Sequence, residues 1–229
     1  MATRYSGQIV TDSLVLALDA SSPRSYNGSG TTWYDLSGNS NICAMVGGVI
    51  HDSGSIQSMV FNSNYVSSSA EITPSTGPLT LCVWINLSET SGRGGVFERN
   101  DGGAYNGISM GQGGSSLWDW TVSGTSDYAN DKLQVAFTYP SVGDWHYYVG
   151  TYDGSTTVNG YDNGVLVGSD SGSIQGNLND QGARDTLNIA RRPASSYINC
   201  KVGLVQVYNK VLSSAEVLQN YNATKGRFD

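Results

Sequence analysis

The chain has 229 residues, a formal net charge of −7 at neutral pH and 14% charged residues. This length suits a single β-sandwich or barrel, and the 29 glycines and 14 tyrosines are typical of a turn-rich β protein. The acidic balance, without a cluster of lysines and arginines, argues against nucleic-acid binding. No apolar run reaches the ~20 residues that a membrane-spanning helix needs, so we expect no membrane insertion.

The first predicted elements are a polar arm and a short buried strand. Residues 1–13 are polar and irregular, and we expect an N-terminal arm that is disordered or docked on a partner. These residues also lack the apolar core of a signal peptide, which indicates synthesis in a cytoplasm. The apolar run Leu14–Leu18 predicts a buried strand, and weaker strands are expected at Cys43–Ile50, Met59–Phe61 and Tyr65–Val66.

Residues Leu79–Leu87 form the clearest predicted strand. Every second residue from Leu79 onward is apolar, whereas the intervening residues are mixed. We therefore expect one face of this strand to be fully buried and the other half-buried, as in a strand packed against a second sheet. Further strands are expected at Leu117–Val122 and Leu133–Thr138.

The segment Asp144–Ser169 contains two turn signals among strand-forming residues. Asp153-Gly154 and Asn163-Gly164 accept positive φ angles at low cost, so each pair can close a tight hairpin. The segment therefore predicts an antiparallel meander.

The last predicted strands lead into a short helix. The strands are expected at Thr186–Ala190, Tyr197–Cys200 and Val202–Tyr208. Ser213, with Glu216 three residues later, forms a capping-box pattern that predicts a helix to about Tyr221 and a tail over 222–229. Many short strands separated by turn signals predict an all-β fold, a jelly-roll sandwich of two antiparallel sheets in one domain over 14–221.

The three cysteines, Cys43, Cys82 and Cys200, cannot all pair within one chain. Cys82 and Cys200 lie in apolar strand patterns, where a free cysteine behaves as a small hydrophobic residue. We expect buried thiols rather than a disulfide.

Several of these segments resemble one known family. Residues 145–154, WHYYVGTYDG, resemble a run found in laminin-G-like domains of the concanavalin A-like lectin/glucanase fold, and 164–168 resemble the hairpin that follows it. Residues 79–85, 188–192 and 202–216 are similar to further strands of that family. The resemblance covers most of Leu14–Tyr221 and implies a concanavalin A-like jelly-roll β-sandwich with a short C-terminal helix.

The two ends of the domain resemble a variant common in virion proteins of tailed phages. Residues 16–20, 30–39 and 219–228 carry this likeness. It implies a non-enzymatic virion protein: a capsid decoration, a head fibre or a tail-associated adhesion module. Its partner would be a capsid or tail protein, or a glycan of the host surface. A soluble carbohydrate-binding lectin domain is the alternative from a different class.

One departure from the family concerns the acidic pair that often holds calcium or packs the helix. Gly203 and Leu204 stand in its place, which weakens a metal site carried over from the family. Loop residues still offer oxygen ligands suited to calcium, but their spacing imposes no site. They are Asp19, Asp35, Asn39, Asp101, Asp127, Asp131, Asp180 and Asp185. No cofactor is expected, calcium stays open, and no metal ligand is assigned.

The sequence does not support catalysis. A glycosidase needs two carboxylates ~5–9.5 Å apart across a sugar, and no two of the four glutamates share a predicted strand. The two histidines, His51 and His146, have no serine in a nucleophile-elbow motif to act upon. A packed or half-exposed role is expected for His146, and no catalytic residue is assigned.

A group of aromatic residues beside the glycine-rich segment 92–114 is the candidate ligand site. Tyr105, Trp118, Trp120 and Tyr128 could stack on sugar rings and hydrogen-bond through their polar tips. In the alternative, Trp118 and Trp120 point inward together and fill the sandwich, since a spacing of two puts both on one face of a strand. The sequence leaves both readings open, and it leaves open whether the chain forms a homo-oligomer.

Overall fold

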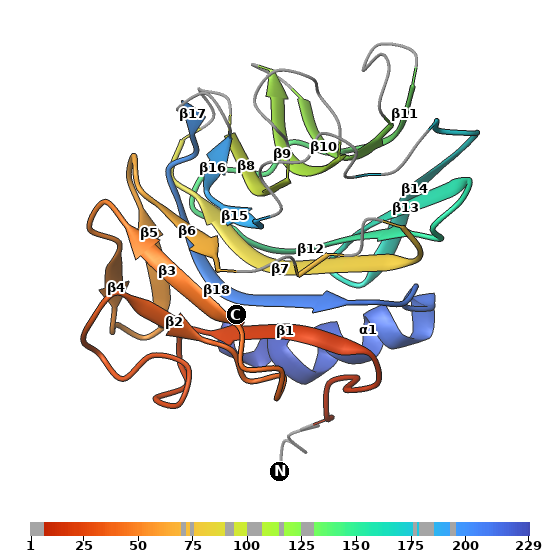
Figure 1. Cartoon of the computed structure of the whole chain (residues 1–229). Helices are drawn as coiled ribbons and strands as arrows, with labels where there is room; N and C mark the ends of the chain where they lie inside the picture. Colours follow the sequence, from red (N-terminus) through yellow and green to blue (C-terminus); the bar gives the residue numbers. More distant parts are fainter. Residues whose placement is uncertain are drawn as a thin grey trace.

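The computed structural model describes residues 7–69, 72–73, 76–89, 94–99, 107–114, 117–124, 131–175, 178, 186–192 and 196–229. Within these residues, sixteen strands form two eight-stranded antiparallel sheets that pack face to face, and two more form a small ladder (Figure 1). The expected all-β sandwich is therefore confirmed. The described helices include none that is long and apolar enough to cross a membrane.

The first sheet, called sheet A, has β7 and β18 at its centre. The full-length pairing of β7 with β12 sets Cys82 opposite Val149 and Trp84 opposite Tyr147. In spatial order its strands are β14 (Val165–Ser171), β13 (Thr157–Asp162), β12 (Trp145–Tyr152), β7 (Leu79–Leu87), β18 (Cys200–Tyr208), β5 (Ser58–Phe61) and β4 (Ile50–Asp52), and β1 (Leu14–Asp19) also pairs with β18.

The second sheet, called sheet B, combines strands from both halves of the chain. Its order is β11 (Lys132–Phe137), β10 (Leu117–Ser123), β9 (Gly107–Gly114), β8 (Gly94–Arg99), β15 (Asn188–Ile189), β6 (Tyr65–Ser68), β3 (Ile42–Val46) and β2 (Thr32–Tyr34). Beside it, β16 (Arg191–Arg192) and β17 (Ser196–Tyr197) form a separate two-stranded ladder.

The meander over Asp144–Ser169 has the expected geometry. β12, β13 and β14 pair in order, and the turns between them lie at the two predicted dipeptides. Asn163 has φ 51° and Gly164 has φ 81°, the pair of positive angles that a type I′ hairpin turn requires. Gly154 has φ 84°, so it also uses the freedom that glycine provides.

The main core lies between the two sheets. Leu81, Val83 and Ile85 of β7 face Trp118 and Trp120 of β10 within one cluster of buried side chains. However, all of β7 except Asn86 is buried, so its second face is closed rather than half-buried as the sequence suggested. The reason lies on the outer side of sheet A.

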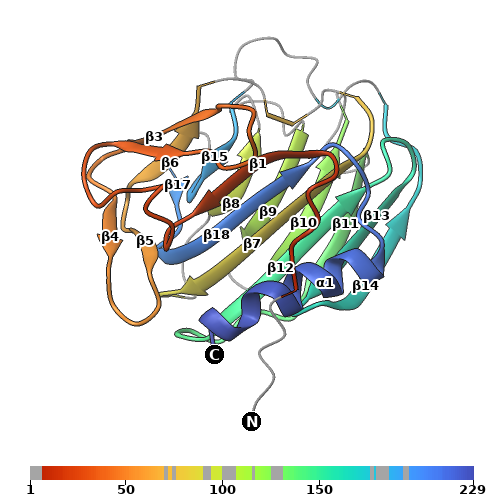
Figure 2. The same ribbon diagram turned by 90° about the horizontal axis from the view of Figure 1, so that it is seen from below.

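A second cluster fills the space between sheet A and helix α1 (Ser214–Thr224). Trp84, Tyr147 and Tyr208 point outward from sheet A, and Val217 of α1 packs on this group. Figure 2 shows α1 lying in front of sheet A, on the side away from sheet B. The predicted capping box is present, because the Ser213 hydroxyl accepts from the Glu216 amide while the Glu216 carboxylate accepts from Ser213.

Both ends of the described chain pack on the same outer face of sheet A. α1 continues to Thr224 and is followed by a 3-10 helix, η1 (Lys225–Arg227), so the residues expected as a tail are structured. Phe228 is buried and stacks on Trp84, with ring centroids 4.3 Å apart. At the other end, the Val10 amide donates to Asn220 Oδ1 at 2.8 Å, which holds part of the expected arm on the helix.

Candidate functional site

The two outer faces of the sandwich differ in what covers them. α1 and both chain ends cover the central strands of sheet A on its outer face. On β10 of sheet B, Trp118, Trp120 and Val122 point into the core, so Asp119 and Thr121 belong to the outer face. The outer face of sheet B is therefore the place to look for a binding site.

A row of polar positions crosses this outer face. Strand register aligns six residues side by side on six neighbouring strands, from β11 to β6: Gln134, Thr121, Ser109, Glu98, Asn188 and Ser67. We call this set the polar row. Amide and hydroxyl groups both donate and accept hydrogen bonds, which is the chemistry that sugar hydroxyls match.

At one end of the polar row, the side chains are either buried or already hydrogen-bonded within the chain. Gln134 Nε2 donates to Asp119 Oδ2 at 2.6 Å, and the Gln134 amide donates to Asp170 Oδ2 at 2.9 Å. Thr121 is only 1% exposed, and its buried hydroxyl has no hydrogen-bond partner among the described residues. The residues at the other end of the row, near β15, β6, β3 and β2, are therefore more accessible to a large ligand.

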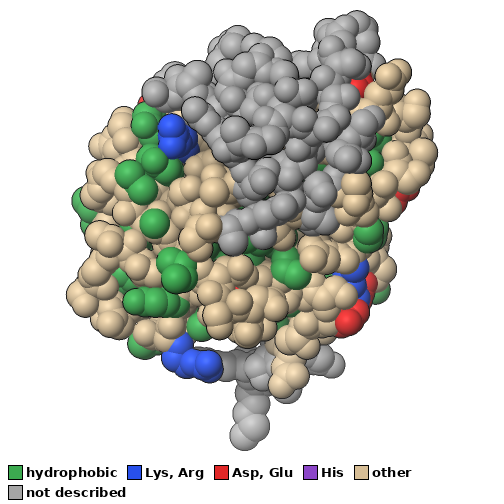
Figure 3. Space-filling model, in the orientation of Figure 1, with side chains coloured by type: hydrophobic (Ala, Val, Ile, Leu, Met, Phe, Trp, Pro, Cys, Tyr) green, Lys and Arg blue, Asp and Glu red, His purple; other side chains and the backbone are tan. Residues whose placement is uncertain are grey.

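At that open end, apolar and aromatic side chains surround the half-buried Ser67 and Asn188. Tyr34 and Ile42 face each other across β2 and β3 and are 51% and 50% exposed, and Val46 pairs with Tyr65. In Figure 3, hydrophobic side chains are visible over the left part of the molecule, where β3 and β4 lie in Figure 1. Apolar surface beside polar groups is what a sugar ring requires, since it has apolar faces and a polar rim.

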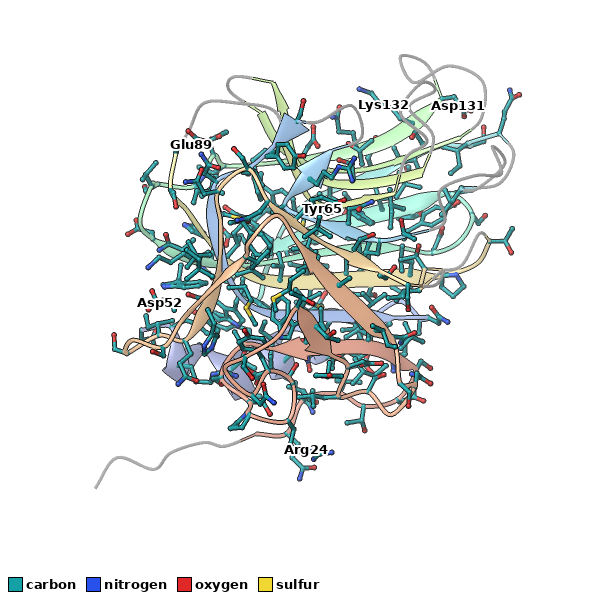
Figure 4. All side chains as sticks on the ribbon, turned by 60° about the vertical axis from the view of Figure 1, so that its left-hand side comes forward. Arg24, Asp52, Tyr65, Glu89, Asp131 and Lys132 are labelled. Carbon is teal, nitrogen blue, oxygen red and sulfur yellow. The ribbon has the colours of Figure 1, made fainter. Side chains whose placement is uncertain are left out.

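Tyr65, Arg191 and Tyr197 form a cluster next to the open end of the polar row. Arg191 Cζ lies 4.3 Å from the centroid of the Tyr65 ring, within the range of a cation–π interaction. The Tyr65 and Tyr197 rings lie 6.3 Å apart at 40°, and Arg191 pairs with Tyr197 in the β16–β17 ladder. Figure 4 shows Tyr65 on the side of the molecule that carries β3 and β6.

The chain reaches Arg191 through a strained residue. Ala190 is fully buried and has φ 68°, in the left-handed region that costs an L-residue about 1–2 kcal/mol. Its carbonyl accepts from the Ile198 amide at 3.2 Å, which fixes the turn. The strain takes the chain out of sheet B after Ile189 and into the separate ladder that carries Arg191. Unusual backbone of this kind is concentrated at functional sites.

Two members of the aromatic group expected from the sequence, Trp118 and Trp120, do not line this face. Trp118 and Trp120 are 0% exposed, so the structure shows the alternative in which they fill the core. The Trp120 indole donates to the Thr151 carbonyl at 3.1 Å, and a Cβ at Gly150 would come within 2.3 Å of its ring. Tyr105 and Tyr128 lie outside the described residues. Sequence reasoning missed the Tyr65–Arg191–Tyr197 cluster, for which the alternation of Tyr65 with Val66 was the only local signal.

Two of the aspartates considered for calcium have structural roles. Asp35 Oδ1 accepts from the Ala17 amide at 2.9 Å, and its other oxygen accepts from Asn41. Asp19 forms a two-pronged ion pair with Arg227, at 2.7 and 2.8 Å. Among the residues that the structure describes, no three His, Cys, Asp or Glu side chains come together as a metal site.

His146 is partly buried at the rim of sheet A. Its Nδ1 lies 3.0 Å from Asp162 Oδ1, and its ring stacks on Tyr148 at 5.3 Å. The hydrogen bond to Asp162 raises the pKa of His146 above its ordinary value, against the opposing effect of burial. No nucleophile is among these neighbours, so the arrangement fits an ion pair that joins β12 to β13.

A pocket of about 510 Å³ lies between η1 and the loop after β4. Its lining includes Ser21, Gln57, Arg227 and Asp229. Arg227 already pairs with Asp19, which neutralises the cation best placed to attract a ligand. The pocket is therefore a weaker candidate than the outer face of sheet B.

Comparison with known proteins identifies a family and a set of related folds. A family model described as the concanavalin A-like lectin/glucanases superfamily matches residues 61–218. No curated protein sequence matches the chain. Among solved structures, the binding domain of Paraclostridial mosquitocidal protein 1 matches with a TM-score of 0.70 at 15% identity, covering 93% of this chain and 52% of that one.

Two structures of the botulinum neurotoxin DC binding domain match over the same fractions of the two chains. The binding domain in complex with rat synaptotagmin II has a TM-score of 0.69 at 16% identity, covering 93% of this chain and 52% of that one. The binding domain in complex with SialylT has a TM-score of 0.67 at 15% identity, with the same coverage. The chain thus spans about half the length of these structures, and at such identities the likeness concerns the fold.

Proposed function

The chain belongs to the concanavalin A-like lectin/glucanase superfamily, and from this premise we propose that it is a non-enzymatic binding module for carbohydrate. The open end of the sheet B outer face is the proposed site. The single observation that carries the proposal is the contrast in covering. Helix α1 and the chain ends pack over the central strands of sheet A, whereas the described outer-face positions of β15, β6, β3 and β2 in sheet B combine half-buried or exposed polar and aromatic groups.

The chemistry of this surface suits a saccharide. Asn188 and Ser67 lie opposite each other and can hydrogen-bond to hydroxyl groups. Tyr65 lies two residues from Ser67 on the same face, about 7 Å along the strand, which is close to the span of one sugar ring. Tyr34 and Ile42 add apolar surface beyond them. Carbohydrate recognition combines these contact types.

The similar structures are consistent with this proposal. The botulinum neurotoxin DC domain is recorded with SialylT and, separately, with rat synaptotagmin II. Because this chain covers 52% of those domains, their ligands can lie in either half. They therefore support a binding role for this fold and leave the choice of ligand to the residues of this chain.

A glycan array tests the proposal. Labelled wild-type chain should bind at least one saccharide class, and Tyr65→Ala and Asn188→Ala should each weaken that binding by roughly tenfold. Leu218→Ala is the matched control, because Leu218 is an exposed residue of α1 on the covered side of sheet A. Running the array with calcium and with EDTA decides whether a cation is required. No binding under either condition would contradict the proposal.

For the setting in which the module acts, we propose the virion of a tailed phage. The sequence likeness at both ends of the domain supports this assignment, and a capsid or tail protein would then anchor the module while the sheet B face meets a host glycan. Mass spectrometry of purified particles tests it. The chain should be recovered with the particle proteins, and its absence from washed particles would remove the virion assignment without affecting the carbohydrate site.

A further inference from the structure

We propose that the ligand of the sheet B site is an acidic saccharide, and that Arg191 binds its carboxylate. This inference rests on the proposed carbohydrate function and specifies the class of sugar. It begins from an imbalance of charge in the molecule.

Among the residues that the structure describes, Arg191 is a cation without an anionic partner, although the chain has an excess of acids. The sequence contains 19 aspartates and glutamates against 12 lysines and arginines. Arg227, Lys201 and Lys210 each form ion pairs with carboxylates. Over the described part of the chain, Arg191 forms none. A partly buried charge normally acquires a partner, so a missing one points to a partner that arrives from outside.

The guanidinium of Arg191 is held in place before any ligand arrives. It lies over the Tyr65 ring at 4.3 Å, and its Nε is buried with no hydrogen-bond partner in the described part of the chain. The ladder pairing with Tyr197 and the strained turn at Ala190 fix the backbone on either side. A fixed guanidinium has less freedom to lose on binding, and its planar fork matches the two oxygens of a carboxylate.

The groups beside Arg191 indicate that the anion is attached to a sugar. Tyr65 and Tyr197 supply ring surface, and Asn188 comes just before the turn that leads to Arg191. Ser67 pairs with Asn188, so a hydroxyl and an amide lie on the same side as the Tyr65 ring. A free inorganic anion would use the charge alone. A pyranose with a carboxylate substituent would use the charge, the amide and the aromatic surface together.

Two kinds of sugar carry such a carboxylate, sialates and uronates. Isothermal titration calorimetry with matched pairs distinguishes them: 3′-sialyllactose against lactose, and oligogalacturonate against its methyl ester. In at least one pair, the acidic member should bind wild-type chain roughly ten- to hundredfold more tightly than the neutral one, the usual effect of a charge-assisted hydrogen-bonded pair. The pair that responds identifies the source of the carboxylate.

Substitution of Arg191 tests its role. Arg191→Gln should remove the preference for the acidic sugar and leave the affinity for the neutral one unchanged. Arg191→Lys keeps the charge and the contact with Tyr65 but lacks the fork, so it should retain only part of the preference. Arg24→Gln is the charge-matched control, because Arg24 is exposed and distant from Tyr65 (Figure 4), and it should behave as wild type. Thermal unfolding checks that each variant is folded. If Arg191→Gln does not fold, the partial loss of preference in Arg191→Lys tests the role of Arg191 in its place.

Three results would overturn the inference. Equal affinity for the acidic and neutral members of both pairs would do so, as would an acidic preference that persists in Arg191→Gln. The third is binding of neutral sugars alone, with neither acidic member bound by the wild-type chain. That last result would leave the proposed carbohydrate function intact, whereas silence on the whole glycan array would remove the proposed function itself.

Discussion

The two sheets show the same alternation of inward and outward side chains, but their outer faces differ in what covers them. On sheet A, the outward residues include Trp84, Tyr147 and Tyr208, and a helix and both chain ends cover them. On sheet B, the outward residues include Ser67 and Asn188, and beside them lies Arg191, which has no anionic partner among the described residues. The comparison teaches that the same alternation yields a covered apolar face on sheet A and a partly exposed polar and aromatic face on sheet B, for which we propose ligand binding.

The largest expected effect is loss of the aromatic anchor on sheet A. Trp84→Ala should lower the free energy of unfolding by about 3–5 kcal/mol, the usual cost of truncating a buried tryptophan. The indole stacks on Phe228 at 4.3 Å and its N–H donates to Thr224 Oγ1 at 2.8 Å, so its removal also loosens the C-terminal segment. Urea unfolding measures the change.

The matching substitution on sheet B is Tyr34→Ala. Tyr34 is half exposed on the outer face, and its loss should change the free energy of unfolding by no more than about 0.5 kcal/mol. If Trp84→Ala and Tyr34→Ala lowered the free energy of unfolding equally, the two outer faces would not differ in their contribution to stability.

A smaller effect is expected at the position where the sequence departs from its family. Gly203 lies in a bulge of β18, and a Cβ there would come within 2.3 Å of the Phe228 ring. Gly203→Ala should therefore cost about 1–3 kcal/mol by overpacking. Phe228→Ala in the same chain removes the clash, so the cost of Gly203→Ala should fall in that background. An unchanged cost in the double variant would show that Phe228 is not the reason for the glycine.

The smallest effect concerns pH and separates stability from binding. The hydrogen bond to Asp162 raises the pKa of His146 in the folded chain, so the pair stabilises the fold fully below the ordinary histidine pKa of 6.5. This contribution is lost as the pH rises through the raised pKa. The difference in unfolding free energy between wild type and His146→Gln should therefore shrink from pH 5.5 to pH 8.5.

Asp162→Asn provides the control for this pH dependence. It removes the partner that raises the pKa of His146, so the additional effect of His146→Gln should then become nearly independent of pH. Sugar binding by wild type should stay level over the same range, because the proposed site on sheet B does not include His146 or Asp162. If the affinity for sugar instead changed with pH in parallel with the protonation of His146, stability on sheet A and binding on sheet B would be coupled.

The parts of the fold that the sequence predicted well are those that local residues determine. Asn163-Gly164 fixes a turn through its own φ angles, and Ser213 with Glu216 caps a helix within one turn. The two-residue spacing of Trp118 and Trp120 correctly placed them on one face, but it could not tell which face was covered. Which face of a strand is covered by other parts of the fold depends on residues that are distant in the sequence.

The cluster of Tyr65, Arg191 and Tyr197 was missed for the same physical reason. Arg191 meets Tyr65 only because β15 pairs with β6, and the turn at Ala190 then redirects the chain. Neither the pairing nor the turn has a local signal in the sequence. Likewise, Gly203 appeared as the loss of an acidic position, whereas the structure shows that it makes room for a ring near the far end of the chain.

The three cysteines give the fold a further property. Cys43, Cys82 and Cys200 are all free and buried. Burial raises the pKa of Cys43 and of Cys82 to about 12 and raises that of Cys200 as well, so the thiolate that reacts with oxidants is scarce. The native structure therefore has no disulfide to lose in a reducing medium and no exposed thiol to oxidise in an oxidising one. The same covalent chain keeps its shape when it passes from one redox environment to the other.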